Sequence, residues 1–207
     1  MNIRDIIYYS PNVMMEDLDF DDKEKLLHAF QDRMENYYFM PIKQLNGLRY
    51  AFATGILLLS LIDAFARYST RIDEPGPRIK EWVKHNLKLG YYNEREIEKI
   101  AGVIYKDFRC GLLHESHIKN CGQFSYEIGS AVYLERDFVI INPSSLFKEI
   151  ESYFQQFIDD LAVNEELYGI FLDRMRKDFE EEQKKFKERD SYKLNRRSQD
   201  NNLKRSQ

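Results

Sequence analysis

The chain has 207 residues, of which 43% are hydrophobic and 32% are charged, and this composition is typical of one globular domain with a substantial core. Nine glycines and five prolines are too few for a loop-rich all-β fold, and two cysteines exclude a disulfide framework. The formal net charge of −4 conceals an acidic body and a basic tail, because residues 184–207 hold nine lysines and arginines against three acids.

The first predicted helix covers residues 22–37, and an aspartate just before it can cap its first turn. Apolar residues recur along it at helical spacing: Leu26, Leu27, Phe30, Met34 and Tyr37. A break is expected around Pro41 and Asn46-Gly47. The next helix, 48–68, is apolar on most faces, so we expect it near the centre of the fold with neighbours around it.

The most apolar run, "AFATGILLLSLIDAFA" at residues 51–66, lies inside this second helix. It is short for a bilayer span, contains Asp63 and is flanked by Arg49 and Arg67. A buried core helix is the better interpretation. We therefore expect no membrane segment and a soluble, cytoplasmic protein.

A third helical region follows the break at Pro75-Gly76-Pro77 and ends at Gly90. The next long helix is predicted over 94–114, and Asn93 with Glu96 three residues on predicts a capping box at its start. One apolar stripe runs along this helix through Ile97, Ile100, Ile104, Phe108 and Leu112.

After Gly122 the spacing of apolar residues changes from the helical period of 3.6 residues to the strand period of 2. Apolar residues alternate with polar ones in "QFSYEI", Gly129-Ser130 is a two-residue turn signal, and the strand-like segments "AVYLE" and "FVII" follow. We expect a small inserted β-hairpin or meander at about 123–141 and β structure nowhere else.

Asn142 and Pro143 suit the start of another amphipathic helix, and a last helix is expected over about 164–189. The predicted fold is therefore mainly all-α, an antiparallel bundle of four to five helices in a single domain, 1–189. The basic segment 190–207 is low in apolar residues, so we expect a disordered tail. Such a tail either contacts nucleic acid or an acidic partner, or is simply solvated.

Histidines and cysteines gather in "DFRCGLLHESHIKNC", residues 107–121. Cys110, His114, His117 and Cys121 would share one face of a continuous helix, but the outer pair would then lie roughly 16 Å apart. Tetrahedral zinc needs all its ligands within about 2.0–2.3 Å. Two or three of these residues could bind a metal only with another segment or with a helix break near Gly111, so we expect no metal site and no cofactor.

Arg109 and His114 suit a different chemistry. The guanidinium group of an arginine can bind a phosphate through paired hydrogen bonds, and a histidine can accept or donate a proton near neutral pH. Together they could cleave RNA without a metal. On an ideal helix, however, the two residues lie about 140° and 7.5 Å apart. Long side chains, a helix end or a second protomer would have to bring them together.

The run "RCGLLHE" at 109–115, at the end of a helix that follows the apolar "GILLLSLIDAFARY", resembles the HEPN superfamily of helical nucleotide- and RNA-handling domains. The hallmark of that family is an arginine and a histidine separated by four to six residues. A polar residue, often asparagine, commonly follows the arginine, and here Cys110 takes that place. The resemblance covers roughly residues 22–165.

The resemblance implies a bundle of four or five helices and a homodimer in which two motifs share a cleft. In active members the arginine and histidine carry metal-independent endoribonuclease chemistry, in toxin–antitoxin pairs, phage defence and CRISPR-associated ribonucleases. An antitoxin or a nucleotidyltransferase-type protein is then a possible partner. Other members only bind RNA, nucleotides or a partner protein. Retention of both Arg109 and His114 favours the enzyme, whereas Cys110 favours the binding protein.

Supporting residues are expected around this pair. Asp63 is a carboxylate in an otherwise apolar helix, so it either pairs with Arg67 one turn on or holds Arg109 across the helix pair. Glu115 and His117 either line the cleft or are ordinary surface residues. Cys110 is interpreted as a small packing residue, because no base is placed beside it.

Overall fold

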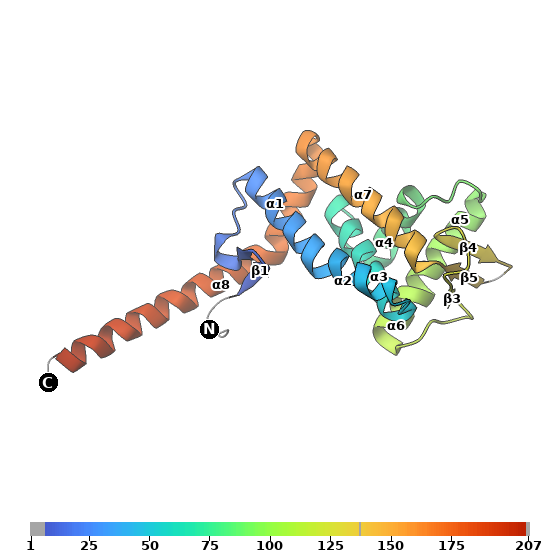
Figure 1. Cartoon of the computed structure of the whole chain (residues 1–207). Helices are drawn as coiled ribbons and strands as arrows, with labels where there is room; N and C mark the ends of the chain where they lie inside the picture. The colour runs from blue at the N-terminus through green and yellow to red at the C-terminus, as the bar shows by residue number, and fades with distance from the viewer. Residues whose placement is uncertain (1–6, 137, 206–207) are drawn as a thin grey trace. The chain divides into compact units, whose positions relative to one another are not determined.

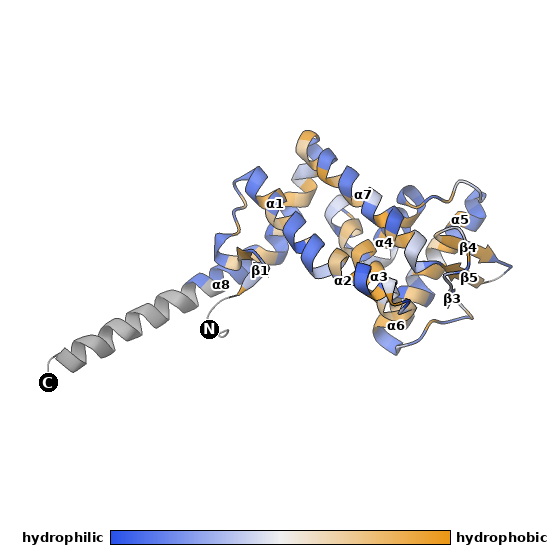
Figure 2. Ribbon diagram, in the orientation of Figure 1, coloured by the Kyte–Doolittle hydropathy of each residue, from blue (hydrophilic) through white to orange (hydrophobic). Residues whose placement is uncertain are grey.

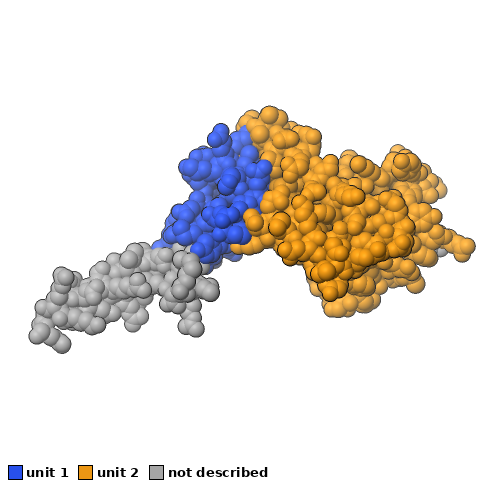
Figure 3. All heavy atoms as spheres, in the orientation of Figure 1, with its two compact units in different colours: residues 1–34, 172–207 blue, residues 35–171 orange. Residues whose placement is uncertain are grey.

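The computed structural model describes residues 7–136 and 138–205, so the first six residues of the predicted domain and the last two of the predicted tail lie outside the described residues. The fold is mainly helical with a few short strands, which confirms the predicted fold class (Figure 1). The chain groups into two compact units (Figure 3): one is formed by residues 1–34 with 172–207, the other by residues 35–171.

The smaller unit combines an early and a late part of the described chain. Its described elements are β1 (Tyr8–Ser10), β2 (Val13–Met14), the short 3-10 helix η2 (Met15–Asp17), α1 (Lys23–Met34) and the later part of α8 (Glu165–Arg205). Strands β1 and β2 pair antiparallel, so the prediction that β structure occurs only at 123–141 is wrong. These strands are too short to show a period-2 pattern in the sequence.

The core of the smaller unit forms around Tyr9, which is fully buried. The ring of Phe179 packs edge-on against Tyr9, with 5.1 Å between ring centroids, and the guanidinium of Arg33 lies over the same ring. Gln183 donates from Nε2 to the carbonyls of Met15 and Leu18. These contacts anchor α8 to the β-ribbon region of this unit.

Helix α8 includes residues 190–205, the segment for which the sequence predicts disorder. Its composition there is polar and rich in lysine and arginine, which are good helix formers, so the helical conformation conflicts with no local propensity. A polar helix of this kind has no apolar stripe with which to bind a core.

The larger unit is built around α3 (Ala51–Ser69). This helix contacts α2 (Met40–Gly47), α4 (Pro75–Asn86), α7 (Pro143–Val163) and the π-helical turn η4 (Ile104–Arg109). The central position predicted for the long apolar helix is therefore confirmed. Its buried residues meet a cluster of rings, in which Phe65 stacks on Phe154 with 5.7 Å between centroids. In Figure 2, apolar and polar residues alternate along α7, as expected for a helix with one buried face.

Helix α3 is long and apolar enough to cross a membrane by length and composition alone. In the fold, however, its buried residues pack against the neighbouring helices, and Asp63 in its middle is held in ion pairs. This is the environment of the core helix of a soluble protein.

Two π-helical turns were not predicted. The turn η3 (Glu35–Phe39) leads directly into α2, whose first turn contains Pro41. The predicted break at Pro41 is therefore wrong, because the chain stays helical from α1 through η3 into α2. The break does follow at Gly47. The second turn, η4, lies between α5 (Glu94–Val103) and α6 (Cys110–Glu115).

The three predicted caps are confirmed, and before α1 it is Asp22 that accepts from the backbone N–H of Lys25 at 3.0 Å. Asn93 and Glu96 form a capping box at the start of α5, with Asn93 accepting from the Glu96 backbone and Glu96 accepting from the Asn93 backbone. Asn142 caps α7 by accepting from the backbone of Ser144 and Ser145, and Pro143 stands in the first turn. The Asn142 amide also donates to the carbonyl of Ile128, so the cap ties α7 to the inserted strands.

The inserted strands lie within the predicted segment 123–141. Strands β4 (Val132–Glu135) and β5 (Phe138–Ile141) form an antiparallel hairpin, and β3 (Gln123–Phe124) pairs parallel with β5. The hairpin turn is at Arg136, which has a φ of 50°, between the two strand-like segments "AVYLE" and "FVII" that the sequence predicts as separate strands. The turn signal Gly129-Ser130 lies between β3 and β4, which do not pair with each other. Ring packing joins this sheet to α3: a Cβ on Gly55 would lie 2.1 Å from the ring of Phe124.

Candidate active site

The candidate site forms where α3, α4 and the end of η4 meet. Asp63 of α3 accepts from Arg109 Nη2 at 2.8 Å through Oδ2, and from Arg78 Nη2 at 2.7 Å through Oδ1. One carboxylate therefore holds two guanidinium groups. Of the two predicted roles for Asp63, the structure has the one in which it holds Arg109 across the helix pair.

Arg78 is the residue of this cluster that was not predicted. Its side chain is 6% exposed and also donates from Nη1 to the backbone carbonyl of Asp73 at 2.9 Å. The sequence does carry a signal for it: Arg78 lies four residues before the buried Trp82 and next to the buried Ile79, on the apolar stripe of α4. A charge on such a stripe needs a partner of opposite sign, and Asp63 is that partner.

Arg109 and His114 meet within one chain. Arg109 donates from Nη1 to Nε2 of His114 at 3.0 Å. The long arginine side chain closes the separation expected between the two helix positions, so a second protomer is not needed to join them. Because arginine has no acceptor, Nε2 of His114 is the acceptor in this hydrogen bond. The histidine ring itself is exposed.

The environment stabilises the charge of Arg109. Burial disfavours the charged form, but the hydrogen bond and the negative charge of Asp63 outweigh it and hold the pKa of Arg109 above its ordinary value. The side chains of Arg109 and Asp63 are each 18% exposed. The ion pair is therefore mostly buried but still accessible to solvent.

A shallow depression of about 300 Å³ lies over this ion-pair cluster. It is lined by Ser60, Asp63, Ala64, Arg67, Arg78, Arg109 and Leu113. Three arginines and one carboxylate give its lining a net positive charge. Guanidinium groups bind phosphate and carboxylate oxygens with paired hydrogen bonds, so the depression suits an anionic ligand such as a phosphodiester.

Cys110 is half-buried and lies beside Tyr105. Burial, together with the interaction with the neighbouring Cys110 side chain, raises the pKa of the Tyr105 hydroxyl. Cys110 is therefore in contact with the aromatic side chain of Tyr105, which agrees with its interpretation as a packing residue.

Glu115 and His117 lie outside the depression. Glu115 forms an ion pair with Lys119, and His117 interacts through Nδ1 with the backbone carbonyl of Glu115 at 3.1 Å. Both side chains are exposed. They are surface residues beside the site, the second of the two predicted alternatives.

The four residues of the possible metal row do not share a helix face, because α6 ends at Glu115 and Ser116 adopts a left-handed conformation with a φ of 59°. His117 and Cys121 therefore lie in the following loop. Across residues 7–136 and 138–205, no three histidine, cysteine or acidic side chains are grouped so that they could hold a metal ion.

Comparison of the chain with models of protein families, with curated proteins and with solved structures finds no match. The functional proposal below therefore depends on the geometry of the site and on the residues that form it.

Proposed function

We propose that the protein is a metal-independent endoribonuclease of toxin or phage-defence type, related to the HEPN superfamily, in which Arg109 and His114 carry out the reaction. The observation that carries the proposal is the direct hydrogen bond from Arg109 to His114, because Arg109 also lines, with two other arginines, the depression beside His114. A proton carrier and a fixed cation thus meet where a phosphodiester could bind.

The proposed reaction is an internal transesterification. His114 Nε2 removes the proton from a ribose 2′-OH, the 2′-oxygen attacks the adjacent phosphorus, and the P–O5′ bond breaks. The products are a 2′,3′-cyclic phosphate and a 5′-OH end, once the leaving oxygen has taken up a proton. Arg109 stabilises the added negative charge on the five-coordinate phosphate.

Asp63 and Arg78 position Arg109 in this proposal. Because Asp63 binds one Nη of Arg109, the other Nη is directed toward His114 in the free protein. An incoming phosphate would compete for that same donor. Binding of RNA would then release Nε2 of His114 at the moment when a base is needed.

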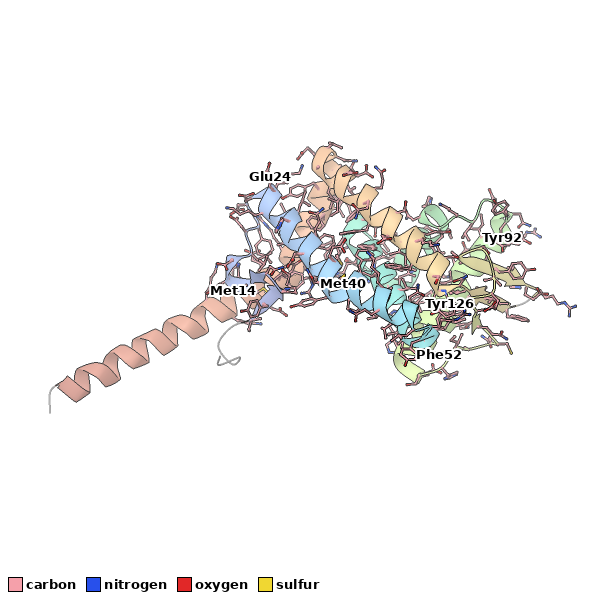
Figure 4. The ribbon with its side chains drawn as sticks, viewed as in Figure 1. Met14, Glu24, Met40, Phe52, Tyr92 and Tyr126 are labelled. Carbon is pink, nitrogen blue, oxygen red and sulfur yellow. The ribbon has the colours of Figure 1, made fainter. Side chains whose placement is uncertain are left out.

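A homodimer is part of the proposal. Its support is an apolar surface beside the depression, formed by Leu113, which is 39% exposed, and by the partly exposed side of α3, where Ile56, Leu57 and Ala64 lie. Phe52, labelled in Figure 4, is a further apolar side chain at the start of α3 and is 55% exposed. A two-fold contact here would bring two histidines to one cleft, so that one acts as base and the other as acid.

The remaining parts of the proposal concern the cell. We propose a cytoplasmic location and an antitoxin or nucleotidyltransferase-type partner, which would keep a ribonuclease inactive until it is needed. The alternative function is a non-catalytic HEPN-like protein that binds RNA, a nucleotide or a partner. Cys110 beside Arg109, in place of a polar residue, is the observation that favours it.

The test is incubation of the purified protein with mixed single-stranded RNA, with and without EDTA, followed by analysis of the product ends. We expect cleavage that EDTA does not reduce, cyclic phosphate ends, and no cleavage of DNA, which lacks the 2′-OH. His114→Ala should lose about 10²–10⁴-fold in rate. Binding of RNA without cleavage would support the alternative, and loss of activity with EDTA would contradict the mechanism.

A further inference from the structure

Phe52, labelled in Figure 4, is an exposed aromatic ring that the fold holds in place. It is 55% exposed, and its ring packs almost at a right angle against the ring of Phe124, with 5.7 Å between centroids. Phe124 packs in turn against Phe108, at 5.4 Å, and Phe108 immediately precedes Arg109. Ring packing therefore links Phe52 to the arginine of the candidate site, although the proposed reaction does not use this ring.

Phe52 and the ion-pair cluster lie on the same side of α3. Phe52 and Asp63 are eleven residues apart. In an α-helix this separation turns the chain to within about 20° of the same direction and advances it by about 16 Å. Residues that are not buried recur along this side of the helix at Phe52, Ile56, Ser60, Asp63 and Arg67, and the last three of them line the depression. The exposed ring and the depression therefore lie along one strip of surface.

The ring also lies to one side of the surface proposed for the dimer. Leu57 and Ala64 belong to that surface, and they lie roughly 120–140° round α3 from Phe52. Leu113, which lines the depression, is the third member on the page. A second protomer that covers these three side chains would leave Phe52 at the side of α3 that Asp63 faces.

The two ends of this strip suit two different chemical groups. Guanidinium groups in the depression bind phosphate oxygens with paired hydrogen bonds, and an exposed aromatic ring stacks on the flat face of a nucleic-acid base. A free phosphate would use the arginines and leave the ring exposed to water. An apolar peptide would use the ring and leave the arginines without an anion. A single nucleic-acid strand carries phosphates and bases together, so it uses both ends.

We propose that Phe52 stacks on a base of the bound RNA strand, a few nucleotides away from the phosphate at Arg109. The inference rests on the proposed function for the position of that phosphate. It also narrows the substrate to unpaired RNA. In a duplex the bases stack on one another, whereas the bases of a single-stranded segment can be splayed out and stacked on aromatic side chains.

The test measures binding of two single-stranded DNA probes of equal length, which the proposed reaction cannot cleave because DNA lacks the 2′-OH. One probe is an oligodeoxyadenylate, and the other is an abasic strand with the same sugars and phosphates. Fluorescence anisotropy of the labelled strands gives both Kd values for the full chain. We expect the wild type to prefer the adenine strand, because the abasic strand keeps the phosphates and lacks the bases that stack on Phe52.

Three variants assign the preference to the ring. Phe52→Leu keeps an apolar side chain without an aromatic face, and it should lower the preference for the adenine strand by about 5- to 150-fold, the range for one stacked base. Its Kd for the abasic strand should not change. Phe52→Trp should keep the full preference, because tryptophan also stacks. Tyr91→Leu, at a ring that is 95% exposed and does not line the depression, is the matched control and should bind as the wild type does.

The proposal would be overturned if the wild type did not bind the adenine strand, or if Phe52→Leu kept the wild-type preference. A monomeric Phe52→Leu beside a dimeric wild type in light scattering would also overturn it, because Phe52 would then be a subunit contact. If Phe52→Leu does not fold, a preference in Phe52→Trp below that of the wild type has the same meaning. Cleavage of RNA without a preference that depends on Phe52 would remove this inference alone, and the preference without cleavage would remove the proposed function alone.

Discussion

Arg78 donates from Nη2 to Oδ1 of Asp63 over 2.7 Å, so the carboxylate that holds Arg109 is itself held by a second, more deeply buried guanidinium. The two arginines come from α4 and η4, and the carboxylate comes from α3. Three helical segments of the larger unit are therefore joined by one side chain.

The first prediction concerns the stability that depends on Asp63. In Asp63→Asn the two guanidinium groups lose their shared negative partner, and Arg78 remains 6% exposed with an uncompensated charge. We expect unfolding free energy to fall by about 3 kcal/mol, at the low end for a broken buried pair because Asp63 is partly exposed. Urea denaturation measures it. Asp159→Asn, at an exposed acid on α7, should change stability by less than about 0.5 kcal/mol.

The second prediction separates charge from geometry at Arg109. Arg109→Lys keeps the positive charge but lacks the planar guanidinium group whose two Nη atoms donate to Asp63 and His114 at once. We expect kcat/KM for RNA to fall by roughly 10²-fold with little change in thermal stability. Arg95→Lys, at an exposed arginine on α5, should be as active as the wild type. Full activity of Arg109→Lys would show that a positive charge is sufficient there.

The third prediction tests the packing of the inserted sheet on α3. In Gly55→Ala the new methyl group would overlap the ring of Phe124, which also packs against Phe108. We expect a loss of about 1–3 kcal/mol, the usual cost of overpacking. Gly169→Ala on α8 has open space around its Cβ and should instead stabilise by about 0.5–1 kcal/mol. Opposite signs for the two glycines in thermal unfolding are the expected result.

The sequence predicted the parts of the fold that local chemistry determines. Asn93 with Glu96 predicted the capping box, and Asn142 predicted the cap of α7, because each interaction spans only a few residues. The parallel pairing of β3 with β5 was not predicted, since β4 lies between these two strands in the sequence and no local pattern specifies their pairing. The π-helical turns were missed for a related reason: tertiary packing, not residue preference, decides where one residue is added to a helical turn.

The candidate site was partly predicted in the same way. Arg109 and His114 were chosen because the run that contains them resembles a known family motif, and Asp63 was chosen from the cost of an unpaired carboxylate in an apolar helix. Arg78 was missed although its position on the apolar stripe of α4 marked it. Which residue of another helix Asp63 contacts depends on how the helices pack. The sequence therefore left two partners open for Asp63, Arg67 on the same helix and Arg109 on another.

The fourth prediction tests the proposed dimer. Leu113→Asp places a charge on the apolar surface beside the depression, where Leu113 is 39% exposed. We expect the wild type to be a dimer at micromolar concentration by light scattering and the variant to be a monomer with reduced ribonuclease activity, because a buried charge is costly at an interface. Tyr91→Asp, at a side chain that is 95% exposed between α4 and α5, is the control and should remain dimeric. A monomeric wild type would rule the dimer out.

The π-helical turn Ile104–Arg109 holds one residue more than an ordinary α-helical turn would. Each residue of an α-helix turns the chain by about 100° and advances it by about 1.5 Å, so one extra residue in a regular helix would rotate every side chain after it. The π-turn takes up that residue locally instead. An in-frame loss of one codon before Arg109 would therefore restore an ordinary α-helix without turning Arg109 away from Asp63, and the number of residues can change here while the direction of the side chains that follow stays the same.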